Sequence, residues 1–139
     1  MNSNVTADEL RAIPLFEGAS DATLQRLATG CGELVSSAGQ IIAMEGDAGS
    51  GMFVILEGTA SVEWRGGTVD LPAGTFFGEL TLLAPGGRRN ARVRAASDMR
   101  SLAIPRDVAL DVIESEPSVA LAMLREVARR FASALPDDD

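Results

Sequence analysis

Histidine and lysine are absent from the 139 residues, and cysteine occurs once. Without histidine the chain lacks the usual general base near neutral pH and the commonest ligand of zinc and iron. A single cysteine, Cys31, excludes a disulfide framework and indicates a reducing compartment, which we take to be the cytoplasm. We expect Cys31 to be a small buried residue rather than a reactive thiol.

Positive charge is also scarce, because twenty acidic residues face twelve arginines and the formal net charge is −8. Proteins that bind nucleic acid usually carry the opposite balance, so we expect no binding to DNA. No apolar run approaches the eighteen residues that a membrane-spanning helix needs, and we expect no membrane segment. No nucleophile–base pair or metal cluster stands out, so the sequence favours a protein that is not an enzyme.

The length suits one domain, residues 1–139, with enough apolar residues for a core. Apolar periodicity changes from helical to alternating and back again along the chain. We therefore expect a mainly β domain with flanking helices. It would consist of N-terminal helices in residues 7–32, strands in 33–104 and C-terminal helices in 105–135, followed by a disordered tail at 136–139.

The stretch at residues 77–95 carries the most chemical information. Phe77, Gly78 and Glu79 precede a short apolar segment, and we expect a helix to begin here with its backbone N–H groups free to meet an anion. Arg89 can offer a planar, bidentate fork to a phosphate. A carboxylate would repel a phosphate, so Glu79 must bind a neutral hydrogen-bond donor of the ligand. A sugar hydroxyl is such a donor. Phosphate and sugar hydroxyl together indicate a nucleotide.

This stretch resembles the phosphate-binding cassette of the cyclic-nucleotide-binding domain family. F-G-E-L-T-L-L at residues 77–83 matches the family pattern, as do Arg89 and the alternating Ala91, Val93 and Ala95. A second matching block contains Gly46, Asp47, Phe53, Ile55 and Gly58. The resemblance extends over residues 7–135 and implies an eight-stranded antiparallel jelly-roll β-barrel, the β-roll of this family.

The resemblance also implies the ligand contacts. Glu79 would bind the ribose 2′-hydroxyl and Arg89 the cyclic phosphate. The full set of expected ligand-binding residues is Phe77, Gly78, Glu79, Leu80, Arg89, Asn90 and Ala91. A plain ion pair between Glu79 and Arg89 is the structural alternative.

Asn90 departs from the commonest family forms, in which a small residue accompanies cAMP and a hydroxyl residue often accompanies cGMP. We expect cAMP as the ligand and cGMP as the alternative. Arg94 is expected to be solvated, whereas Arg88 and Arg92 could add positive potential for an approaching anion.

The last helix, residues 117–135, carries an apolar stripe that we interpret first as a packing face. Its members are Val119, Met123, Leu124, Val127, Phe131 and Leu135. In the family this helix can cap the base of the ligand or pair two subunits. Met123, Arg130 and Phe131 are candidates for the cap, and a homodimer through this helix is a further expectation.

The sequence thus predicts a regulatory module that responds to a cyclic nucleotide and acts on a protein partner in trans. The alternative is a ligand-free interaction module that retains the fold. A metal cupin is a more distant alternative, because cupins usually need several histidines. No effector segment follows the last helix, and we expect the chain to act alone rather than as a fragment.

Overall fold

The computed structural model describes residues 4–43, 51–79, 83 and 91–134. The helices are α1 (Ala7–Arg11), the 3-10 helix η1 (Pro14–Phe16), α2 (Asp21–Gly30), α4 (Arg106–Ser115) and α5 (Pro117–Ala134). The strands are β1 (Gly32–Ser36), β2 (Ile41–Ala43), β3 (Gly51–Glu57), β4 (Ala60–Trp64), β5 (Gly67–Leu71), β6 (Phe76–Phe77), β7 (Arg92–Ala95) and β8 (Met99–Pro105).

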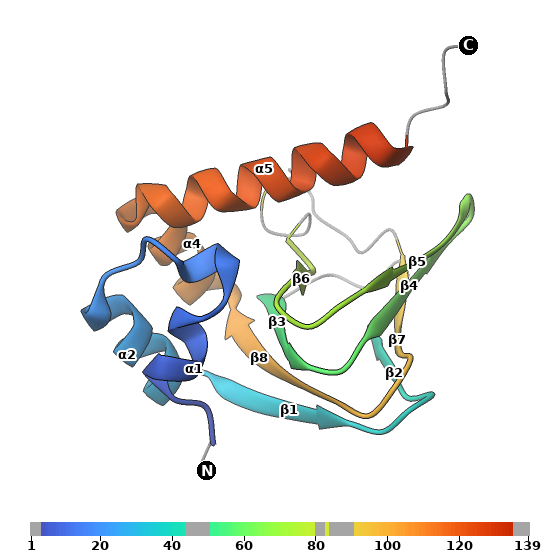
Figure 1. Cartoon of the computed structure of the whole chain (residues 1–139), viewed down its shortest axis with the longest axis horizontal. Helices are drawn as coiled ribbons and strands as arrows, with labels where there is room; N and C mark the ends of the chain where they lie inside the picture. The colour runs from blue at the N-terminus through green and yellow to red at the C-terminus, as the bar shows by residue number, and fades with distance from the viewer. Residues whose placement is uncertain (1–3, 44–50, 80–82, 84–90, 135–139) are drawn as a thin grey trace.

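The strands form two antiparallel four-stranded sheets, with the orders β1-β8-β3-β6 and β2-β7-β4-β5. The helices gather against the first sheet, and α5 passes above β6 (Figure 1). The predicted fold, an eight-stranded antiparallel β-roll with helices before and after it, is confirmed. Within the described part of the chain, no helix is both long enough and apolar enough to cross a membrane.

The β1-β8-β3-β6 sheet separates two apolar cores. On its outer face Met52, Val54 and Leu102 pack against the helices. On its inner face Ile55 and Phe77 belong to a second core inside the roll. Successive strand residues point to opposite faces, so β3 can be apolar from Met52 to Leu56 and still bury both sets of side chains.

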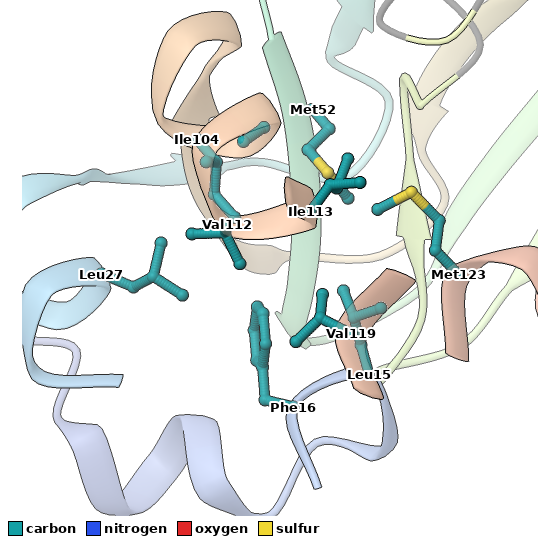
Figure 2. Close-up of a pocket in the computed structure, with 10 residues that line it drawn as sticks. Leu15, Phe16, Leu27, Met52, Ile104, Val112, Ile113, Val119 and Met123 are labelled. Carbon is teal, nitrogen blue, oxygen red and sulfur yellow. The ribbon is translucent and has the colours of Figure 1, made fainter. Parts of the chain in front are cut away.

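The outer core is closed by helices from both ends of the chain. Figure 2 shows Phe16 of η1 and Leu27 of α2 converging with Val112, Val119 and Met123. The cavity left among these residues is about 10 Å³, which is room for one water molecule at most. This region is therefore a packed core and not a ligand pocket.

Local signals set most helix ends as the sequence predicts. The Ser20 hydroxyl caps α2 by accepting from the Thr23 N–H, and α2 ends at Gly30. One detail differs. Pro105, expected as the first residue of a helix, is the last residue of β8 and the N-cap of α4. The β4–β5 hairpin turns at residues 65–66, because Gly67 already pairs with Trp64.

Arg100 ties α1 to the sheet through three carboxylates. Its guanidinium lies 2.9 Å from Glu9, 2.5 Å from Glu33 and 3.1 Å from Glu57. Hydrogen bonding to Arg100 is the main reason that the pKa of Glu33 lies below its ordinary value. The network joins residues far apart in sequence, which helps to seat the N-terminal helix on the outer face of the roll.

Gly58 has a backbone φ of +87°, and a Cβ added there would lie 2.3 Å from the Asp98 carbonyl oxygen. We expect Gly58→Ala to lower the free energy of unfolding by roughly 2–5 kcal/mol, from left-handed strain and overpacking together. Gly39 also has a positive φ, +91°, but an added Cβ there meets nothing within 4 Å. Gly39→Ala should therefore cost only about 1–2 kcal/mol. Urea denaturation measures both, and equal losses would contradict the steric account.

Glu116 links α2 to the junction of α4 and α5. Its carboxylate accepts hydrogen bonds from the Thr23 hydroxyl and from the Ser20 hydroxyl at 2.7 Å, which hold the pKa of Glu116 below its ordinary value. Because the folded-state pKa is lowered, this stabilisation is present above the unfolded value of 4.5 and is lost as the pH falls through the folded value. Glu116→Gln should lower the melting temperature at pH 7, and its difference from the wild type should shrink as the pH falls below about 4.5. The exposed Glu114 provides the control, Glu114→Gln, which should change little at either pH.

Candidate functional site

The predicted ligand-binding stretch begins on β6, a strand that the sequence did not predict. β6 pairs with β3, so Phe53 lies opposite Phe77 and Val54 opposite Phe76. Phe77 points into the roll, where its ring stacks on that of Phe53 with centroids 4.9 Å apart. Phe76 points to the helical side. The two aromatic residues therefore anchor the start of the cassette in both cores.

Gly78 turns the chain out of β6 with a φ of +89°, a conformation that favours glycine. Glu79 follows, and its side chain is only 8% exposed. The Leu83 N–H donates to the Glu79 carbonyl at 3.2 Å. The helix start expected here falls mostly on residues outside the described part of the chain and stays a prediction.

Several of the predicted ligand-binding residues fall outside the described part of the chain, namely Leu80, Arg89 and Asn90. Ala91 is described and lies half-buried just before β7. The structure thus positions Phe77, Gly78, Glu79 and Ala91, and the contacts expected of Leu80, Arg89 and Asn90 stay predictions.

Arg130 of α5 reaches the cassette from the other end of the sequence. Its Nη1 donates to Glu79 Oε1 at 3.0 Å, and its Nη2 donates to the Phe76 carbonyl at 2.6 Å. The guanidinium also lies over the Phe76 ring, 4.7 Å from its centroid. A planar guanidinium with several fixed donors suits this combination of contacts.

Glu126 completes the cluster one helical turn before Arg130. Its Oε2 accepts from Arg130 Nε at 2.8 Å and from Arg129 Nη2 at 2.7 Å. The neighbouring guanidinium groups, Arg129 first, hold the pKa of Glu126 below its ordinary value. Glu126 therefore stays ionised near neutral pH and holds Arg130 toward the cassette.

The three candidates for a base cap lie in different places. Arg130 contacts the cassette, whereas Met123 is 3% exposed and belongs to the helical core. Phe131 is 67% exposed. The structure brings only Arg130 of these three against a described cassette residue, and a capping role stays a prediction for all of them.

The apolar stripe on α5 is not one packing face. Val119, Met123 and Val127 pack against the helical core, but Leu124 and Phe131 are exposed. The interpretation of Leu124 and Phe131 as packing residues was therefore wrong. Helical periodicity allowed the error, because both apolar sets recur every three or four residues and only the position of the roll separates them.

The arginines of β7 are already paired. Arg92 Nε lies 2.7 Å from Glu63 Oε1, and Arg94 donates to the Gly39 carbonyl at 2.8 Å. Glu63 thus offsets the positive potential that we expected from Arg92. Arg88 lies outside the described residues.

The described residues hold no group of three or more potential metal ligands. A hollow of about 220 Å³ opens elsewhere on the roll, at strand ends and turns. It contains none of the predicted ligand-binding residues and is lined by two carboxylates and the multiply paired Arg100. Such a lining does not suit a phosphate, so the cassette is the better candidate site.

Comparison with known families agrees with this geometry. The model of the cyclic nucleotide-binding domain matches residues 33–116, more than half of the chain. This chain belongs to the cyclic nucleotide-binding domain family.

Relatives of this cyclic nucleotide-binding domain occur in different kinds of protein. A cyclic nucleotide-gated potassium channel of Rhizobium etli is 36% identical over 67% of the chain and 26% of the channel. The crystal structure of the Thermus thermophilus catabolite activator protein is 28% identical, with a TM-score of 0.72 over 87% of this chain and 59% of that one. The regulatory domain of Toxoplasma gondii PKA, crystallised with cAMP, shares the fold, with a TM-score of 0.74, 20% identity and coverage of 88% and 48%.

The domain spans only 26% and 34% of the length of two curated channel relatives. Such relatives therefore establish the type of domain, and leave open the activity to which the domain is attached.

The sequence indicated Arg130 as a candidate cap for the ligand, but its direct contacts with Glu79 and the Phe76 carbonyl were missed. The spacing of Glu126 and Arg130 is typical of an ion pair on a helix surface, and that signal was available. Neither Glu79 nor the Phe76 carbonyl lies near α5 in sequence, so their contacts with Arg130 could not be predicted.

Proposed function

We propose that this domain is a regulatory module that binds a cyclic nucleotide, cAMP first and cGMP second, and performs no chemistry itself. The single observation that carries the proposal is the buried Glu79 carboxylate, presented just after Gly78 within the family's cassette. Glu79 would accept from the ribose 2′-hydroxyl, and Arg89 would pair with the cyclic phosphate. The backbone N–H groups at the helix start would complete the anion site.

Binding would act on a protein partner through α5, because Arg130 connects that helix to Glu79. The net charge of −8 favours a protein partner over DNA, since DNA binding requires basic residues to neutralise phosphates. A ligand that binds one position of α5 better than another would shift the population of that position.

A second candidate function, the ligand-free interaction module, has one specific observation in its favour. Glu79 already forms an ion pair with Arg130, as a structural carboxylate would. Titration with nucleotide separates the two candidates.

We expect calorimetric titration to show binding of cAMP, and Arg89→Ala to weaken it at least about thirtyfold. Losing a charge-assisted contact to a desolvated phosphate costs roughly 2–5 kcal/mol. Arg88→Ala, which removes the same charge one residue earlier, should have a much smaller effect. A heat of binding with cGMP but not with cAMP would make cGMP the ligand. The absence of a heat of binding with both nucleotides would favour the ligand-free module.

We also propose that the exposed apolar face of α5 pairs two copies of this domain. The face, which we call the α5 seam, alternates four- and three-residue steps, as the seam of a coiled coil does. Its described members are exposed and lie away from the packed residues Val119 and Met123: Leu121, Leu124, Ala128 and Phe131. One side of α5 faces the rest of the molecule and the other is open (Figure 1).

Leu124→Glu should convert a dimer into a monomer, because a dimer would bury the new charge without a partner. Light scattering after gel filtration measures the mass, and we expect the dissociation constant to rise more than about tenfold. Val69→Glu, at another exposed apolar residue, is the matched control and should leave the mass unchanged. A wild-type domain that is monomeric at all concentrations tested would contradict the pairing.

A further inference from the structure

Arg130 is the main described anchor of the C-terminal part of α5. The first half of the helix is held by Val119 and Met123, which are buried in the helical core. Beyond Val127, every described side chain up to residue 133 is exposed except that of Arg130. The position of this part of α5 relative to the roll therefore depends on the groups that Arg130 binds, namely Glu79 and the Phe76 carbonyl.

The Glu79 carboxylate is nearly buried, and Arg130 is one of the groups that contact it. Its side chain is 8% exposed, and Oε1 accepts from Arg130 Nη1 at 3.0 Å. A ribose hydroxyl that is to donate to this carboxylate must first reach it. A hydrogen bond from a charged guanidinium is stronger than one from a neutral hydroxyl. The existing contact with Arg130 therefore disfavours its replacement by the ribose hydroxyl at Glu79.

We propose that Arg130 and the ribose 2′-hydroxyl of the nucleotide compete for the Glu79 carboxylate, so that Arg130 is a built-in antagonist of ligand binding. This inference rests on the proposed function. Arg130 and Arg89 would therefore have opposite effects on nucleotide affinity. Arg89 attracts the ligand, whereas Arg130 must leave Glu79 before the ligand can bind.

The competition has a consequence for α5, because linkage is reciprocal. If the contact between Arg130 and Glu79 lowers the affinity for the nucleotide by some factor, then the bound nucleotide lowers the equilibrium constant of that contact by the same factor. Nucleotide binding would therefore release the C-terminal part of α5 from Phe76 and Glu79. This part carries Ala128 and Phe131 of the α5 seam, so its release would change the surface offered to a partner.

The experiment is a titration of the full chain with cAMP and with 2′-deoxy-cAMP, using the wild type, Arg130→Met and Arg129→Met. Methionine preserves an unbranched chain against the Phe76 ring and removes the guanidinium donors. Arg129→Met is the matched control, because it removes the same charge from the neighbouring residue. In the described structure Arg129 pairs with Glu126 and leaves the contact between Arg130 and Glu79 intact.

We expect Arg130→Met to bind cAMP about tenfold more tightly than the wild type, and Arg129→Met to match the wild type. The gain should be much smaller with 2′-deoxy-cAMP, which has no 2′-hydroxyl to offer Glu79. Hydrogen exchange supplies a second readout: amides of residues 128–134 should exchange faster when cAMP is added to the wild type, and equally fast in Arg130→Met without ligand.

Unchanged or weaker cAMP binding by Arg130→Met would overturn the competition while leaving the proposed function intact. An equal gain with both nucleotides would also overturn it, because Arg130 would then block access without competing for the carboxylate. Absence of binding in all variants would overturn the proposed function itself. Should Arg130→Met melt below the assay temperature, Arg130→Lys, which retains the charge but loses the fork, should show a smaller gain of the same sign.

Discussion

The pairing of β3 with β8 is the interaction on which the rest of the molecule depends. Val54 lies opposite Leu102 in this pair, and both are fully buried on the helical side. Ile55, the next residue along β3, is fully buried inside the roll. One sheet thus serves as the wall of two cores. Burial on both faces fixes the register of β3, since a shift of one residue would exchange every side chain between the cores.

The position of the candidate site follows from that wall. β6 pairs with β3 at Phe53 and Val54, so Phe76 and Phe77 also point into different cores. Gly78 and Glu79 follow β6 directly, and Arg130 of α5 contacts Glu79 there. The same short segment therefore contacts the roll interior, the helical layer and the buried carboxylate. A displacement of α5 and a change at Glu79 are coupled because both act on this segment.

The arginines on the strands of the roll are bound by nearby carboxylates. Arg100 faces three carboxylates, and Arg92 shares Glu63 with Arg94. In a chain with a net charge of −8, such pairing leaves little positive potential on the described surface of the roll. The phosphate site would then depend on its local donors, the predicted Arg89 and the backbone N–H groups, more than on the long-range field.

Much of the fold could be predicted from the sequence, because its signals are local. Ser20 marks the start of α2 by capping it, Gly30 marks its end, and alternation marks most strands. β6 escaped prediction because two residues are too few to show a period. The cassette pattern selected Phe77, Gly78 and Glu79 as ligand-binding residues, since a contiguous motif carries its own spacing, and that role stays a prediction. Leu124 and Phe131 were misplaced, because the sequence of a helix with two apolar faces does not say which face is covered.

The sequence by itself determined the type of domain, the order of its elements and the identity of the carboxylate in the cassette, all of which depend on residues close together in the chain. The tertiary structure alone decided what faces that carboxylate. Glu79 and Arg130 lie 51 residues apart, and their contact exists only because packing of Val119 and Met123 directs α5 across β6. Contacts of this kind follow from the relative position of whole elements, and the summed packing of many side chains sets that position.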